Sequence, residues 1–169
     1  MAANQLAPPR VIATAHTADG KSIIASDAPA PIFKPFGPNG TGFSTFHTAT
    51  RVPVSNVERL QPAANTIPRP APEGALFCIS DFQPGGGSPM HRSLTLDYAF
   101  VLSGEVTLTL DTGMEVTVKA GEVVLQRGTM HKWTNNGTEP CRVAVVMMGS
   151  EKVVLADGTP LEAEIIRPT

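Results

Sequence analysis

The chain has 169 residues, of which 41% are hydrophobic and 17% are charged, and its formal net charge is −2. This length and composition predict one globular domain rather than a disordered chain. A net charge this small provides no excess of positive charge for binding nucleic acid or an anionic membrane surface. We therefore expect a small-molecule ligand, with no nucleic-acid partner and no membrane partner.

Location is indicated by three features of the sequence. No apolar run approaches the roughly 20 residues that a membrane-spanning helix needs. The first ten residues, MAANQLAPPR, lack the charged start and apolar middle of a secretory signal. Cys78 and Cys141 each lie in an apolar, strand-like run, which favours buried free thiols, with a disulfide as the alternative. These features together predict a cytoplasmic protein.

Short alternating runs bounded by glycine and proline dominate the first part of the chain, and helical periodicity is absent. This pattern is typical of an all-β protein. Residues 10–15 and 22–26 are predicted to pair as a hairpin through an Asp-Gly turn, and another strand is expected around residues 44–49. The proline-rich segments 28–41 and 61–74 are expected to be irregular, because proline removes backbone donors.

The strand pattern becomes sharper after Gly74. Strands are predicted over residues 75–80 and 94–102, followed by a strictly alternating hairpin over residues 106–118. Further strands are expected over residues 122–126, around Trp133, over residues 142–148 and in a short hairpin in the tail, residues 153–166. About ten short strands with regular turns predict a β-sandwich or a β-barrel.

Two faces of very different character alternate along the strand that follows the glycine-rich stretch GGGSP. We expect the apolar face to be buried, with each large side chain stabilising the fold by roughly 1.5–3 kcal/mol. It consists of Leu94, Leu96, Tyr98, Phe100 and Leu102. The opposite face begins with His91, Ser93, Thr95 and Asp97, and it either meets solvent or lines a polar cavity.

A second stretch, GEVVLQRGTMHKWTN at residues 121–135, has the same form. A glycine turn leads into a strand, another glycine follows, and His131 comes three residues later. Two glycine-preceded histidines on two strands of one small β-domain suggest that both belong to one site. Imidazole suits such a site either as a metal ligand or as a general acid or base near neutral pH.

These two stretches resemble the paired motifs of the cupins. The first is matched by Gly85, His91, Asp97 and Gly104, and the second by Gly121, Gly128, His131 and Asn135. The resemblance covers residues 75–148 and implies a double-stranded β-helix, that is, a jelly-roll barrel. We expect the barrel over residues 61–169, with N-terminal strands and an extended segment at residues 1–60 packing on it as part of one structural domain.

The departures from the cupin pattern bear on the chemistry. Metal-binding cupins place three histidines and a glutamate on the ion, whereas this chain has Ser93, Asp97 and, at the proline position of the second motif, Gln126. The metal set that remains is His91, Asp97 and His131, and two histidines with one carboxylate can hold Zn or Fe(II). We favour a metal-free site without a cofactor, and keep a divalent metal, Zn or Fe, as the alternative.

Three functions follow from this interpretation. The first is a lyase or isomerase, of the dehydration or decarboxylation type, acting on a cyclic or polyketide-like metabolite of specialised metabolism. The second is a metal-dependent oxygenase, and the third is a non-enzymatic binding protein. The predicted catalytic residues are His91, His131 and Asp97. The predicted substrate-binding residues are Ser93, Arg92, Tyr98, Trp133, Gln126 and His47.

Structural roles are the alternative for several of these side chains. The ring of His91 can be hydrogen-bonded by the backbone alone, and Asp97 can hydrogen-bond the backbone of the glycine loop. Arg92 lies on the face of its strand opposite to His91, where it can form an ion pair at the surface. The resemblance to cupins also implies a homodimer. The extended segment of residues 1–60 is a reasonable source of strand exchange between two copies.

Overall fold

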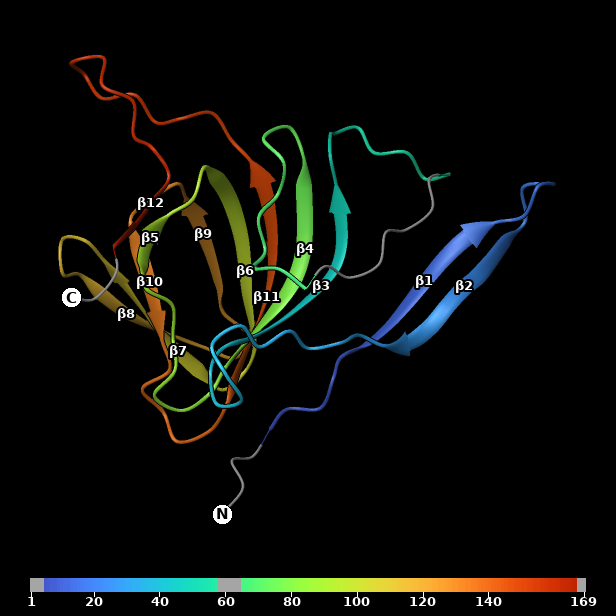
Figure 1. Cartoon of the computed structure of the whole chain (residues 1–169), viewed down its shortest axis with the longest axis horizontal. Helices are drawn as coiled ribbons and strands as arrows, with labels where there is room; N and C mark the ends of the chain where they lie inside the picture. The colour runs from blue at the N-terminus through green and yellow to red at the C-terminus, as the bar shows by residue number, and fades with distance from the viewer. Residues whose placement is uncertain (1–4, 58–64, 167–169) are drawn as a thin grey trace.

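The computed structural model describes residues 5–57 and 65–166, which form an all-β molecule (Figure 1). In the described part of the chain, no helix is long and apolar enough to cross a membrane. The strands found there are β1 (Arg10–His16), β2 (Ser22–Pro29), β3 (Gly42–Ala49), β4 (Ala75–Phe82), β5 (Met90–Arg92), β6 (Thr95–Ser103), β7 (Glu105–Leu110), β8 (Glu115–Lys119), β9 (Val123–Arg127), β10 (His131–Thr134), β11 (Cys141–Gly149) and β12 (Glu164–Ile166).

Two antiparallel five-stranded sheets form the barrel. One has the strand order β3-β4-β11-β6-β9 and the other has the order β12-β5-β10-β7-β8. From β4 onward the chain passes repeatedly from one sheet to the other, and Figure 1 shows the two sheets facing each other. This arrangement is the double-stranded β-helix that the sequence predicted, and the predicted all-β class is confirmed.

The N-terminal strands behave in two ways. β3 pairs with β4 and extends the first barrel sheet. The hairpin predicted from its Asp-Gly turn is β1–β2, which forms a separate two-stranded sheet that extends away from the barrel (Figure 1). The predicted boundary at residue 60 lies outside the described residues.

Apolar side chains from both sheets fill one part of the barrel interior. This core cluster consists of Phe82, Ala99, Val101, Val106, Leu108, Val118, Trp133, Cys141 and Val143. A smaller cluster of Leu76, Cys78 and Met147 lies against it through Val145. Both cysteines are buried and free, in agreement with the prediction of free thiols.

The alternation predicted along β6 is present, but the prediction of which face is buried was wrong. Asp97 and Val101 are 4% and 1% exposed, whereas Tyr98 and Phe100 are 43% and 41% exposed. The polar face points into the barrel, and the apolar face forms the outer surface of the sheet. Hydrophobicity predicted that the apolar face would be covered, but in a single copy no described element covers this part of it.

A buried ion pair ties β11 to β4 and to the N-terminal segment. Arg142 donates from Nε and Nη2 to the two carboxylate oxygens of Asp81, both at 2.7 Å, and Nη2 also donates to the carbonyl oxygen of Ala7 at 2.8 Å. The two side chains are only 15% and 5% exposed. Loss of the guanidinium would leave a buried carboxylate without its partner.

We therefore predict that Arg142→Met lowers the free energy of unfolding by about 3–5 kcal/mol, measured by urea denaturation. Arg10→Met is a matched control, because Arg10 pairs with Asp27 at 2.6 Å while the side chains are 67% and 38% exposed. The control should change the free energy of unfolding by about 1 kcal/mol or less. Equal losses in the two variants would contradict the prediction.

Candidate active site

The glycine-rich loop before β5 is bonded along its length to the end of β10. The N–H of Gly85 donates to the carbonyl of Asn135 at 2.8 Å, and the N–H of Ser88 donates to the carbonyl of Trp133 at 2.9 Å. Gly85 has a φ of +73°, which favours glycine. A Cβ at Gly87 would lie 2.3 Å from the carbonyl oxygen of Trp133. Glycine therefore allows this loop to hold β5 against β10.

This pairing brings the two predicted histidines together. His91 on β5 and His131 on β10 are direct cross-strand partners. Their ring centroids lie 4.3 Å apart, and the planes of the rings are inclined by 52°. His131 is 2% exposed, and His91 is partly buried. Two side chains separated by forty positions in the sequence thus form one histidine pair.

Backbone carbonyls orient both rings in the same way. Nδ1 of His91 lies 2.9 Å from the carbonyl oxygen of Pro89, and Nδ1 of His131 lies 2.8 Å from that of Thr129. A carbonyl oxygen only accepts hydrogen bonds, so each Nδ1 carries the proton and each neutral ring keeps its lone pair on Nε2. The backbone does satisfy His91, as the structural alternative proposed, but it leaves the second nitrogen of the ring available.

Burial keeps the two rings neutral. It lowers the pKa of His131 to about 4, assisted by the charges of His91 and Arg69 and opposed by the bond to Thr129. Burial also lowers the pKa of His91, against the bond to Pro89. Both imidazoles are therefore uncharged at neutral pH and can accept a proton at Nε2.

Asp97 lies on the opposite sheet, where β6 pairs with β9. Nε2 of Gln126 donates to Oδ2 of Asp97 at 2.8 Å, so the predicted alternative partner, the glycine-loop backbone, is wrong. Oδ1 of Asp97 and Oε1 of Gln126 are buried and have no hydrogen-bond partner. Burial raises the pKa of Asp97 and outweighs the lowering effects of Thr95, Gln126 and Arg69. This environment makes the carboxyl group a weaker acid than a free aspartate side chain.

The donor set does not fit a metal site formed by His91, Asp97 and His131, the three candidate ligands that this chain keeps. Among the described residues, no three His, Cys, Asp or Glu side chains are grouped closely enough to hold a metal ion. His91 and His131 lie together, but Asp97 is bonded to Gln126 on the other sheet. We therefore derive no catalytic step through a metal, and the expected absence of a cofactor stays a prediction.

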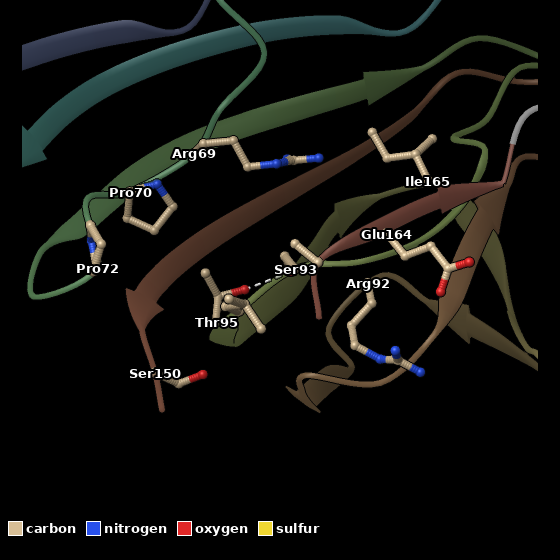
Figure 2. Close-up of a pocket in the computed structure, with 11 residues that line it drawn as sticks. Arg69, Pro70, Pro72, Arg92, Ser93, Thr95, Ser150, Glu164 and Ile165 are labelled. Atoms are coloured by element: carbon tan, nitrogen blue, oxygen red, sulfur yellow. Dashed lines mark hydrogen bonds between the residues drawn. The ribbon is translucent and has the colours of Figure 1, made fainter. Parts of the chain in front are cut away.

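A cavity of about 380 Å³ opens beside β5 and β12 (Figure 2). Its walls come from the proline-rich loop before β4, the β5–β6 junction, the segment after β11 and the C-terminal strand β12. They are Arg69, Pro70, Pro72, Arg92, Ser93, Leu94, Thr95, Ser150, Ala163, Glu164 and Ile165. The cavity adjoins the pair without including it, because its wall residue Ile165 is the cross-strand partner of His91.

The predicted substrate-binding residues divide between this cavity and other places. Ser93 and Arg92 line it, and the Ser93 hydroxyl is bonded to that of Thr95 at 2.7 Å. Gln126 lies beside Asp97. Together with Thr95 on the first sheet and the histidine pair on the second, these two residues are called the polar layer of the barrel.

Besides Gln126, three of the predicted substrate-binding residues lie outside the cavity, and the structure places them elsewhere in the molecule. Tyr98 and His47 are exposed on the outer face of the first sheet, since each occupies the outward parity of its strand. Trp133 is 8% exposed and packs in the apolar core rather than against the cavity.

Arg69 is a site residue that the sequence analysis missed. It extends from the proline-rich loop across the cavity toward Ile165 (Figure 2). Its charge lowers the pKa of His91, His131 and Asp97, so it lies within electrostatic reach of both sheets of the site. The available signal was a single cation flanked by prolines in the sequence IPRPAP.

Comparisons with known proteins identify the family. A family model described as "Cupin domain" matches residues 78–158. The chain is 31% identical to the cupin-domain-containing oxidoreductase fogC of Aspergillus ruber, over 83% of this chain and 72% of the relative. It is 34% identical to the phomopsin biosynthesis cluster protein C' of Diaporthe leptostromiformis, over 78% and 72% of the two chains. The chain belongs to the cupin-domain family.

Another relative is matched over a shorter region. The cupin-domain-containing oxidoreductase srdD of Neurospora crassa is 41% identical over 53% of this chain, and the match spans about half, 47%, of the relative.

Solved structures support the same fold. The polyketide cyclase RemF of Streptomyces resistomycificus has a TM-score of 0.51 at 17% identity, covering 83% of this chain and 82% of that one. The Cnp3 cupin domain of Schizosaccharomyces pombe has a TM-score of 0.54 at 11% identity, covering 83% and 88%. At these identities the likeness concerns the fold alone.

The burial of His131 makes stability depend on pH. Its pKa is about 4 in the folded chain against 6.5 for the free side chain, so the unfolded chain binds more protons between these values. The contribution of His131 is present above pH 6.5 and is lost as the pH falls to 4, by about 3 kcal/mol in total. The raised pKa of Asp97 acts in the opposite direction.

We predict that His131→Asn flattens the pH dependence of unfolding between pH 6.5 and 4, measured from urea midpoints. The difference between wild type and variant isolates the histidine from Asp97. His47→Asn, which changes an exposed histidine, should leave the slope unchanged. A wild-type slope retained in His131→Asn would contradict the assignment.

Proposed function

We propose that the protein is a lyase or isomerase that acts on a small organic metabolite by acid/base chemistry. The observation that carries the proposal is the opposed titration of the groups in the polar layer. Burial lowers the pKa of both histidines on one sheet and raises the pKa of Asp97 on the other. Groups whose environments separate their protonation states in this way are suited to act as base and acid.

A dehydration illustrates the chemistry. Nε2 of a neutral histidine takes a proton from the carbon next to a carbonyl group, and the electron pair of that C–H bond forms the new C=C bond. The C–O bond to the leaving hydroxyl breaks, and the hydroxyl takes the proton of Asp97 and departs as water. His91 is the better base of the pair, because a pKa of about 4 makes His131 weakly basic. Each such group typically contributes about 10²–10⁴-fold to the rate.

The relatives support a role in specialised metabolism. Two proteins of Diaporthe leptostromiformis carry the name of the phomopsin biosynthesis cluster, and a relative in Aspergillus oryzae carries that of the oryzines biosynthesis cluster. These names place the relatives among biosynthetic genes. A cyclic or polyketide-like substrate remains part of our proposal for this chain.

Oxidoreductase activity is the second candidate. It is favoured by the names of the relatives from Aspergillus ruber, Hypocrea virens and Neurospora crassa, which are each called oxidoreductases. A redox reaction changes the composition of the substrate in a different way from elimination or isomerisation. The two candidates are therefore distinguished by the product. An oxidoreductase adds oxygen or removes two hydrogens, whereas the lyase removes water or carbon dioxide and the isomerase leaves the mass unchanged.

The test begins with deletion of the gene in its source organism. The metabolite that accumulates is purified, incubated with the protein and followed by mass spectrometry, in air and without oxygen. We predict loss of water or carbon dioxide, or no change of mass, at the same rate under both conditions. Conversion that requires oxygen or changes the redox state would reject the lyase or isomerase assignment, and binding without conversion would indicate a binding protein.

The same assay tests the residues. His91→Ala and Asp97→Asn should each lower kcat by about 10²-fold or more while the folded spectrum is kept. His131→Ala should also abolish conversion, since it removes the partner ring. His47→Ala, on the outer face, should convert the metabolite at the wild-type rate.

A further inference from the structure

We propose that the substrate carries a carboxylate, and that Arg69 binds this group at the rim of the cavity. The inference rests on the proposed function, since it names the class of molecule that reaches the histidine pair. It assigns to Arg69 the role of a substrate-binding and orienting residue.

The first support is that Arg69 forms no contact ion pair with any described residue, although the charge of Asp97 acts on it from a distance. Within the described residues its guanidinium makes one hydrogen bond, from Nη1 to the carbonyl of Pro68 at 2.7 Å, and it forms no ion pair with a carboxylate. Arginine presents five donors in a planar fork that fits a carboxylate in a bidentate manner. Most of that donor capacity is available to a ligand.

A second cation lies at the same cavity. Arg92 lines the wall, and its Nε is buried and has no hydrogen-bond partner. Its Nη1 reaches only the carbonyl of Glu162, at 3.4 Å. Glu164, the cross-strand partner of Arg92, supplies the single acidic side chain of the wall. Two guanidinium groups against one carboxylate leave the cavity with an excess of positive charge.

The rest of the wall suits an organic molecule. Pro70, Pro72, Leu94 and Ile165 supply apolar surface, and the hydroxyls of Ser93 and Thr95 are bonded to each other. A volume of about 380 Å³ lies within the range of small-molecule sites. A carbon skeleton can occupy this space while its carboxylate meets Arg69.

Binding of an anion at Arg69 would also act on the histidine pair. The charge of Arg69 lowers the pKa of both His91 and His131. A carboxylate bound to the guanidinium offsets that charge, so the two imidazoles become stronger bases when the substrate is present. The same residue therefore links recognition of the substrate to the strength of the base.

The test uses a fixed panel of small aromatic and aliphatic carboxylates, including benzoate, salicylate and phenylacetate, each beside its primary amide. Binding to the full chain is measured by NMR titration, and the imidazole resonances are followed against pH. We expect at least one carboxylate to bind about tenfold or more tightly than its amide. We also expect the pKa of His91 to rise when that carboxylate binds.

Arg69→Gln should abolish the preference for the carboxylate and the shift at His91. Arg127→Gln is the matched control, because it removes the same charge from an exposed position on β9. The inference is overturned if no carboxylate in the panel binds more tightly than its amide, or if Arg69→Gln keeps the preference. Because no turnover is measured, a carboxylate preference can stand even where the lyase or isomerase assignment fails.

Discussion

The site depends on the pairing of β5 with β10, which the glycine loop makes possible. β5 contains only three residues, so its own ladder is short. The loop before it supplies additional backbone bonds to β10, and the close approach of Gly87 to Trp133 leaves no room for a side chain. Because β12 pairs with the other edge of β5, the same short strand also brings the C-terminal segment to the cavity.

Desolvation then determines what the paired histidines can do. A buried imidazolium is costly, and the neighbouring ring and Arg69 add like charges, so both rings remain neutral. The backbone carbonyls accept hydrogen bonds from the Nδ1–H groups and leave Nε2 available for chemistry. Ser93, at the position where metal-binding cupins have a histidine, directs its hydroxyl to Thr95 instead. Ser93, which replaces a metal-ligating histidine, therefore has a hydrogen-bond partner two residues further along the chain.

Several parts of this arrangement could be predicted from the sequence, because local spacing determines them. The glycine–histidine spacing and the alternation along β6 predicted the all-β fold and the strands that carry His91, His131 and Asp97. The sequence did not reveal which face of β6 points inward, since hydrophobicity does not distinguish a face buried inside the barrel from an apolar face on its outer surface. For the same reason the positions of Tyr98 and His47 were predicted wrongly.

Arg69 and β12 were beyond sequence reasoning for another reason. Both reach the cavity from proline-rich or irregular segments, whose paths are set by tertiary contacts rather than by a repeating pattern. The cation that influences both sheets of the site therefore comes from a segment that strand periodicity does not describe.

The polar interior and the apolar exterior of the first sheet are two consequences of one strand pattern. Each inward position given to Asp97, Gln126 or Thr95 is a position that cannot contribute an apolar side chain to the core. The outward positions of the same strands carry Tyr98, Phe100 and Leu125, whose burial against a second copy would add the missing apolar contact. If the expected homodimer covers this face, association of the two copies stabilises the sheet that holds Asp97 and Gln126.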